Sequence, residues 1–167
     1  DFVDPKGALF VPAARETIPA IQHLLDLART SGMMVCFTQD WHTPEDPEFA
    51  IWGSHAVADT WGSEVIPELA PQGGEFIIHK QQYDACFGTN LDQVLRERGI
   101  RDVIVCGTVA NICVHYTAAS AALRGYRVIL PTDAISALTP FDMEATLRQT
   151  SWLFRGKVTT SRGVHTV

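Results

Sequence analysis

The stretch that decides the fold is residues 103–124, which read VIVCGTVANICVHYTAASAALR. Residues 103–106 are apolar and mostly β-branched, as in a parallel strand that is covered on both faces. Gly107 ends this strand, and the small residues after position 113 favour a closely packed helix that stops at Gly125. The stretch therefore predicts a buried strand, a tight turn and a helix that opens at Cys113.

Cys113 lies in the first turn of that predicted helix. The unpaired backbone N–H groups and the positive end of the helix dipole stabilise a thiolate there, and the thiolate is the nucleophilic form of cysteine. Free cysteines are also among the most buried side chains in proteins. Position alone therefore leaves two alternatives for Cys113, a reactive thiol and a small core residue.

The rest of the chain alternates predicted strands and helices. After a loop-like start, an apolar helical pattern runs from Ile18 to a stop at Gly32. Strands are predicted at residues 34–38, 75–78, 103–106, 127–130 and 157–160, and further helices at 90–98, 113–123 and 143–154. Such alternation is typical of a parallel sheet covered by helices. We therefore predict an α/β fold, a three-layer α/β/α Rossmann-like domain with a mostly parallel central sheet. No Gly-x-Gly-x-x-Gly or Walker pattern opens a predicted helix, so we expect no nucleotide cofactor.

Composition narrows the class of partner. A chain of 167 residues with 46% apolar content suits one compact domain. The formal net charge of −6 and the lack of a basic block argue against nucleic acid or an anionic membrane, and favour a small molecule. We find no apolar run long enough to span a bilayer and no secretory pattern. The four cysteines show no C-x-x-C spacing, which predicts reduced thiols and a cytoplasmic protein.

Lys80 follows the apolar run 76–78, so it is expected at the sheet edge that also presents Asp40 and Cys113. Ligands of open α/β sheets bind at that edge. A lysine there lowers the pKa of a nearby thiol by its charge, whereas the alternative is an exposed lysine after a strand. Tyr83 and Phe87 follow closely, and aromatic side chains beside charged groups suit a flat pocket.

The segment Asp40-Trp41-His42 places a carboxylate and an imidazole at the end of a predicted strand, with Glu48 and His55 in the long irregular stretch 43–74 that follows. A loop of this length in a compact domain is usually functional. Imidazole and carboxylate ligands suit zinc, iron or manganese at a catalytic site. The alternative is that Asp40 caps a turn and that both histidines lie on the surface.

Taken together, GTVANIC at residues 107–113, the strand that ends at Lys80, the QDWH segment at 39–42 and the Asp1-Phe2 start resemble the isochorismatase-like cysteine hydrolases, in their nicotinamidase/pyrazinamidase branch. The resemblance covers essentially the whole chain, and GTVANIC is its most specific part. It implies that Cys113 attacks an amide carbonyl with assistance from Lys80 and an aspartate. That aspartate would precede Asp1, so we expect residues 1–167 to form a single domain that lacks its first strand.

The same resemblance implies the remaining site residues. A divalent ion, with zinc first and iron or manganese as alternatives, would be bound by Asp40, His42 and His55, and by Glu48 as a fourth ligand in some members. Phe2 and Trp52 would stack on a substrate ring, with Tyr83 and Phe87 on the lysine side. A cis peptide at Thr108-Val109, together with the N–H of Cys113, would form an oxyanion hole. Family members also associate, so a homodimer or homotetramer is expected.

These features predict a cysteine amidohydrolase that converts a small planar amide, nicotinamide in the first instance, into its acid and ammonia. One alternative is a family amidase for a ureido or carbamoyl compound, which needs no ion to hold a ring nitrogen. Another is a non-catalytic binding domain. A third is a thiol-redox protein, in which Cys86 or Cys106 would act as the resolving thiol.

Overall fold

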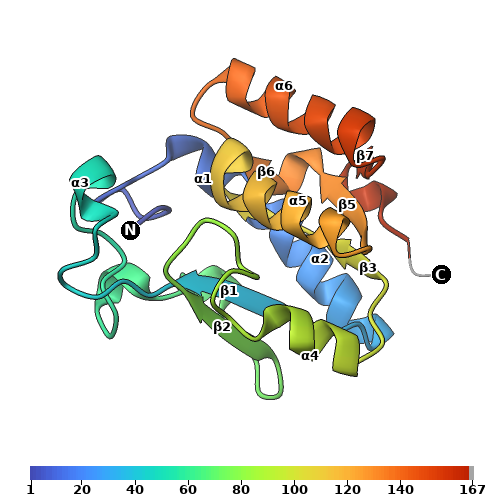
Figure 1. Ribbon diagram of the computed structural model, residues 1–167, viewed down its shortest axis with the longest axis horizontal. Helices are drawn as coiled ribbons and strands as arrows, with labels where there is room; N and C mark the ends of the chain where they lie inside the picture. Colours follow the sequence, from blue (N-terminus) through green and yellow to red (C-terminus); the bar gives the residue numbers. More distant parts are fainter. Residues whose placement is uncertain (166–167) are drawn as a thin grey trace.

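A computed structural model describes residues 1–165 of the chain as an alternation of strands and helices (Figure 1). The strands are β1 (Cys36–Asp40), β2 (Phe76–Lys80), β3 (Asp102–Ile104), β4 (Gly107–Thr108), β5 (Arg127–Pro131), β6 (Ile135–Ser136) and β7 (Lys157–Thr159). The α-helices are α1 (Pro12–Glu16), α2 (Ile18–Ser31), α3 (Phe49–Trp52), α4 (Leu91–Glu97), α5 (His115–Leu123) and α6 (Pro140–Arg148). Two π-helical turns, Ala110–Val114 and Gln149–Leu153, precede α5 and follow α6.

All strand pairings are parallel, as the alternation predicts. They form three ladders, β1–β2, β3–β5–β7 and β4–β6, where the sequence predicted one central sheet. The short ladder β4–β6 was not predicted, because Gly107 and Thr108 were assigned to the turn after the strand. The register of the first ladder sets Asp40 beside Lys80, which brings two strand ends to one edge.

Helices cover both faces of the β3–β5–β7 ladder (Figure 1). Leu24 of α2 packs with Ile104 and Ile129 on one face. On the other face, Ala118 and Ala121 of α5 belong to the same cluster as Val128. Neighbouring strand residues thus point to opposite helices, as the two-residue period of a strand requires. The three-layer α/β/α prediction is confirmed.

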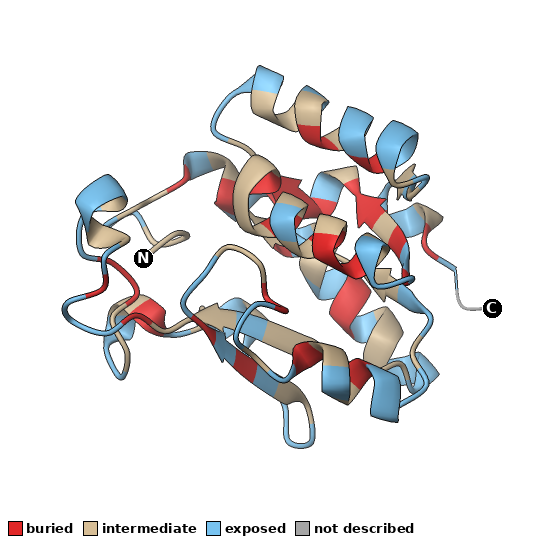
Figure 2. Cartoon of the chain, viewed as in Figure 1, coloured by how far each residue is buried: buried red, intermediate tan, exposed pale blue. Residues whose placement is uncertain are grey.

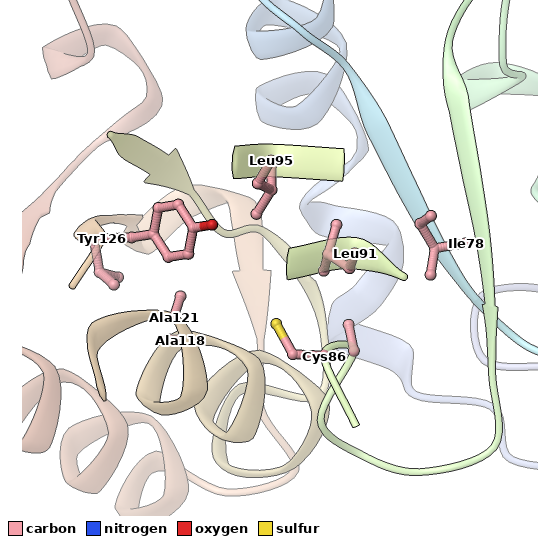
Figure 3. Packing of buried hydrophobic residues seen from close by; sticks show 9 residues of the cluster. Ile78, Cys86, Leu91, Leu95, Ala118, Ala121 and Tyr126 are labelled. Atoms are coloured by element: carbon pink, nitrogen blue, oxygen red, sulfur yellow. The ribbon is translucent and has the colours of Figure 1, made fainter. Parts of the chain in front are cut away.

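The largest buried cluster joins the β1–β2 ladder to the β3–β5–β7 ladder through α4 and α5. Figure 3 shows Leu91 and Leu95 of α4 beside Ala118, Ala121 and Tyr126, with Ile78 of β2 at the other side. Burial of such side chains contributes about 25 cal/mol per Å² of apolar surface removed from water. In Figure 2 the buried residues gather on β5 and on the inner sides of α5 and α6, while the outer faces of these helices are exposed.

A slot separates the β1–β2 ladder from the β3–β5–β7 ladder. This inter-sheet slot is a cavity of about 300 Å³, lined by β1, by residues 105–108, by the inner side of α2 and by the start of α5. Within residues 1–165, β1 pairs only with β2 and β3 only with β5, so one edge of each strand has no strand partner. The slot opens at the sheet edge where Asp40, Lys80 and Cys113 lie.

Element boundaries differ from the predictions at two places that matter for the site. β1 begins and ends two residues later than expected, so Gln39 and Asp40 belong to the strand itself. α5 begins at His115, because Ile112 has non-helical angles (φ −115°, ψ −105°) and breaks the preceding turn. No helix in the described part of the chain is long and apolar enough to cross a membrane.

Candidate active site

Cys113 lies in the π-helical turn between β4 and α5, half-buried at the mouth of the inter-sheet slot. The prediction that it opens a helix is corrected, since α5 starts two residues further along. The backbone around Val109 still ties the turn to the helix, because its carbonyl accepts hydrogen bonds from the N–H of Ile112 at 3.1 Å and of Val114 at 3.2 Å. The cysteine is therefore held on a short, tightly bonded turn.

Lys80 is the neighbour that distinguishes this cysteine. Its side chain is buried, with the residue only 5% exposed, so the expectation of an exposed lysine does not hold. Nζ forms an ion pair with Asp40, donates to the carbonyl of Gln82 at 3.0 Å, and lies 3.7 Å from Cys113 Sγ. Three predicted groups from separate segments thus meet at one point: Asp40, Lys80 and Cys113.

Two opposing influences act on the pKa of the Cys113 thiol. Burial raises the pKa of Cys113 to about 11, and the nearby charge of Lys80 only partly opposes this rise. The pKa of Lys80 is itself raised, because burial lowers it less than Asp40 and Cys113 raise it. A thiol whose pKa is raised in this way needs a base to become a thiolate, which is the nucleophilic form of cysteine.

The backbone before Cys113 carries the predicted cis peptide, at Thr108-Val109. The side chain of Thr108 is fixed by a hydrogen bond to Ser136 Oγ at 2.7 Å, across the β4–β6 ladder. Thr108, Val109 and Cys113 all line one cavity. The oxyanion-hole role of these three residues remains a prediction.

That cavity, called the site cavity here, has a volume of about 310 Å³ and is mostly apolar. Phe2, Trp52 and Tyr83 line it, together with Cys113, and their contact with a substrate remains a prediction. Trp52 Nε1 donates to Tyr83 Oη at 2.9 Å, so α3 and the loop after β2 are joined across the cavity wall. The remaining lining residues are Ala8, Leu9, Phe10, Val11, Asp40, Glu48, His55, Thr108, Val109, Ile112 and Leu138.

Phe87 is not one of these lining residues, and its assignment to the substrate pocket is wrong. It is 65% exposed. Its backbone N–H bonds the carbonyl of Asp84 at 3.1 Å, in a turn that buries the neighbouring Cys86 in the core and leaves the phenyl ring outside. A residue seven positions beyond a strand end is too far along an irregular loop for its direction to be inferred from sequence.

Asp40, His42 and His55 form a group that could hold a metal ion, because their ligand atoms lie within 4.8 Å of one another. Both histidines are buried, at 1% and 3% exposure. His42 Nε2 is a buried nitrogen without a hydrogen-bond partner, which is the state expected of a ligand atom. Glu48 Oε1 lies 3.8 Å from His55 Nε2, and burial raises the pKa of Glu48. The donor set therefore suits a divalent cation.

One residue at this site escaped the sequence analysis. Asp46 is buried and its Oδ2 lies 3.0 Å from Nδ1 of His42. The signal for it was an aspartate four residues after a histidine, set between Pro44 and Pro47 in an otherwise irregular stretch. An aspartate four residues after a histidine is too common in sequences to predict a contact between the two side chains, unless the turn that joins them is known.

The carboxylates of Asp1 and Asp4 have local structural partners. Asp1 accepts hydrogen bonds from the N–H of Ala56 at 2.8 Å and of Ala8 at 3.1 Å. Asp4 accepts from the N–H of Lys6 at 2.9 Å. Both carboxylates therefore stabilise the local backbone.

Residues 1–162 match the profile of the isochorismatase domain. The chain belongs to the isochorismatase family. The uncharacterized isochorismatase family protein YwoC of Bacillus subtilis is 35% identical over 150 residues, which cover 86% of this chain and 79% of the relative. The ureidoacrylate amidohydrolase RutB of Agrobacterium fabrum is 31% identical, over 87% of this chain and 73% of the relative. The resemblance found in the sequence is thus confirmed at the level of the family.

Solved structures of several similar proteins share the fold. N-carbamoylsarcosine amidase from Thermoplasma acidophilum superposes with a TM-score of 0.90 at 36% identity, over 97% of this chain and 92% of the other. Nicotinamidase PncA from Bacillus subtilis gives 0.89 at 27% identity, over 95% and 92%. Pyrazinamidase of Pyrococcus horikoshii, in complex with zinc, gives 0.88 at 29% identity, over 94% and 92%. These similar proteins bear several different substrate names.

Proposed function

We propose that the protein is a cysteine amidohydrolase that cleaves a small planar amide into an acid and ammonia through a thioester. The observation that carries the proposal is the 3.7 Å approach of Lys80 Nζ to Cys113 Sγ, a sulfur whose residue also lines the site cavity. A cysteine beside a buried cation, with room for a carbonyl, is the arrangement that nucleophilic catalysis requires. The amidohydrolase, amidase and nicotinamidase names of the similar proteins support the same reaction class.

In the proposed reaction, Cys113 Sγ attacks the amide carbonyl carbon, and one carbonyl electron pair moves onto the oxygen. The backbone N–H groups of Val109 and Cys113 stabilise that oxyanion, a contribution worth about 3–4 kcal/mol for one donor in other hydrolases. When the carbonyl re-forms, the C–N bond breaks and the nitrogen leaves as ammonia with the proton of the thiol. Water then adds to the thioester, which releases the acid and restores the thiol.

This scheme requires a base that takes the thiol proton, because burial raises the pKa of Cys113 to about 11. Asp40 is already paired with Lys80. We propose that the base is an aspartate on a strand that precedes Asp1 and fills the inter-sheet slot. One edge of β1 has no strand partner within residues 1–165, and β1, residues 105–108 and Asp1 all line the slot.

A neutral ring amide, nicotinamide in the first instance, is the substrate that we propose. The lining of the site cavity is mostly apolar, which suits a neutral substrate. Phe2, Trp52 and Tyr83 provide aromatic walls for a flat ring.

We propose that Asp40, His42 and His55 hold a divalent ion, with zinc as the first candidate and Glu48 as a further ligand. The unpartnered Nε2 of His42 and the 4.8 Å spread of the ligand atoms support this assignment. The zinc complex of the similar pyrazinamidase supports the choice of metal. When bound, such an ion supplies an open coordination position for a ring nitrogen.

The second candidate is an amidase for a ureido or carbamoyl compound. It is favoured by identity, because N-carbamoylsarcosine amidase from Thermoplasma acidophilum is 36% identical to the chain and the nicotinamidase PncA of Bacillus subtilis only 27%. The two candidates differ in what the site cavity must bind, a neutral ring or a carboxylate. A thiol-redox role is a further alternative, with Cys86 or Cys106 as the resolving thiol, and all four cysteines are free in the structure.

The experiment that tests the proposal is an ammonia-release assay on nicotinamide, pyrazinamide, ureidoacrylate and N-carbamoylsarcosine, with the full-length protein and with a Cys113→Ala variant. We expect release from the ring amides by the wild-type protein and none by the variant. Release from only the two carboxylate-bearing compounds would replace the proposed substrate by the second candidate. Release from none of the four, or equal release by the variant, would overturn the proposed function.

Self-association as a homodimer or homotetramer, in the cytoplasm, is also part of the proposal. The outer faces of α5, α6 and the turn after α6 carry exposed apolar side chains, Leu123 at 83%, Phe141 at 75% and Trp152 at 71% exposure. Exposed apolar side chains of this size suit an interface with another copy of the chain. Light scattering after size-exclusion chromatography gives the mass directly, and a monomer at micromolar concentration would contradict this part.

A further inference from the structure

Asp46 is a buried carboxylate that neither the proposed reaction nor the proposed metal ligands use. It is 7% exposed and lies in the turn between β1 and α3, flanked by Pro44 and Pro47. The turn is closed by backbone hydrogen bonds on both sides of it, from Asp46 N–H to the carbonyl of Thr43 and from Phe49 N–H to the carbonyl of Asp46, each 3.1 Å long. Its side chain therefore has a fixed direction.

Both oxygens of this carboxylate are engaged. Oδ2 lies 3.0 Å from Nδ1 of His42, and Oδ1 accepts the backbone N–H of Glu48 at 2.9 Å. One side chain thus contacts a proposed ligand and the backbone of a second one. An ionised carboxylate can only accept hydrogen bonds, so Nδ1 of His42 must carry the hydrogen. The lone pair of the neutral imidazole is then on Nε2, the buried atom that has no partner.

His55 is held in the same tautomer by a backbone acceptor. Its Nδ1 lies 2.8 Å from the carbonyl oxygen of Gly53, which also can only accept. Both rings therefore turn Nε2 toward the shared group with Asp40. The difference is that the backbone orients His55, whereas a side chain orients His42. Only the second contact can be removed by a substitution.

We propose that Asp46 is a positioning residue, which fixes His42 in its Nδ1–H tautomer with Nε2 toward the metal group and anchors Glu48 beside it. This inference rests on the metal site of the proposed function. Outer carboxylates that accept from a ligating imidazole fix its ring orientation and raise its basicity. Their removal weakens metal binding by roughly 10–100-fold in characterised sites.

The test compares Asp46→Ala and Asp46→Asn with a matched control, Glu45→Gln. Glu45 is the preceding residue and is exposed. Its replacement by Gln removes the same unit of charge without changing a contact of His42. The dissociation constant for zinc alone is measured by competition with a chromophoric chelator. Nitrogen-15 chemical shifts of His42 in the metal-free proteins report its tautomer independently of any ion. Melting curves of the metal-free proteins identify a variant that fails to fold.

We expect Asp46→Ala to weaken zinc binding by about 10–100-fold and to mix the two tautomers of His42. Asp46→Asn should weaken zinc binding less than Asp46→Ala does, because the amide oxygen of Asn can accept the same hydrogen bond but carries no charge. Glu45→Gln should bind zinc as the wild type does. Two results together would overturn the proposal. The first is an Asp46→Asn variant that folds as the wild type does and keeps both the wild-type zinc affinity and the single His42 tautomer. The second is an Asp46→Ala variant that weakens zinc binding no more than Glu45→Gln does.

The same data separate this proposal from the one on which it rests. A wild-type protein that binds no zinc would refute the metal site, and with it the role of Asp46, while the His42 tautomer would still show whether the contact orients the ring. Normal wild-type binding with no effect of Asp46→Ala would refute the positioning role alone and would leave the metal site standing.

Discussion

The thiol–lysine pair and the metal group share one site but are held by different kinds of structure. Lys80 ends a regular strand, and Cys113 lies on a short turn between a strand and a helix. His42, Asp46 and His55 lie in an irregular stretch, where single polar contacts such as His42–Asp46 and His55–Gly53 fix each ring. Ladder and core packing hold the first group, so we expect its geometry to survive substitutions that disorder the second.

The largest effect is expected from Cys113→Ala, which removes the proposed nucleophile. Loss of a nucleophile in comparable hydrolases lowers kcat by about 10⁴–10⁶-fold, because the remaining groups cannot form the covalent intermediate. Ammonia release is the measurement. Cys86→Ala is the matched control, since Cys86 belongs to the core cluster and does not line the site cavity. Equal losses in the two variants would mean that the thiol at 113 has no special role.

Lys80→Gln should lower kcat by about 10²–10⁴-fold, the range for a positioned group that assists proton transfer. Burial raises the pKa of Cys113 to about 11 and Lys80 opposes that rise, so loss of the ammonium should raise the pKa further. Below this pKa the thiolate fraction grows about tenfold per pH unit.

Alkylation of Cys113 by iodoacetamide, followed by mass spectrometry between pH 7 and 10, measures that fraction. We expect a steep rise with pH in the wild type and slower labelling of Lys80→Gln at every pH. Lys157→Gln, at an exposed lysine of β7, is the control. Faster labelling without Lys80 would contradict the assigned electrostatics.

His42→Ala should remove a metal ligand and weaken zinc binding by more than the roughly 10–100-fold expected for outer contacts such as Asp46. If the two halves of the site are held independently, the alkylation profile of Cys113 should stay within about twofold of the wild type. His23→Ala, at an exposed position of α2, is the control. A large change in Cys113 labelling would show that the loop and the strand ends are one unit.

The smallest effect is expected from Tyr83→Phe, which removes the acceptor of the Trp52 Nε1 hydrogen bond. A hydrogen bond of this kind contributes about 0.5–1.5 kcal/mol, which corresponds to roughly a two- to tenfold rise in KM. Tyr116→Phe is the control, because its ring lies against Tyr83 at the surface. An unchanged KM would mean that this contact does not shape the site cavity.

The sequence predicted the half of the site that regular structure holds. Lys80 and Asp40 follow apolar runs, and parallel strands bring their ends to one edge whatever the details of packing. The start of α5 was misplaced because Ile112 adopts angles that its residue type does not reveal. The sequence left two alternatives for Cys113, because burial, which raises the pKa of its thiol, is a property of the folded chain.

The metal group, which lies in the irregular stretch, could be predicted only in part. Metal-ligand types at 40, 42 and 55 were recognisable, and the structure brings them together. Asp46 was missed and Phe87 was wrongly placed, because the direction of a side chain in a loop depends on turns that no period in the sequence encodes. Gly107 and Thr108 were likewise read as a turn, although they pair with Ile135 and Ser136.

The central claim is that Cys113 carries the acyl group during turnover, and mass spectrometry of acid-quenched full-length protein tests it most directly. The protein is mixed with excess nicotinamide or pyrazinamide, quenched within milliseconds to seconds, and digested. The account predicts that the peptide containing Cys113 gains the mass of the acyl group, and that Lys80→Gln gains it more slowly. Steady ammonia release without any acyl adduct on Cys113, or an adduct on Cys86 or Cys106 instead, would contradict it.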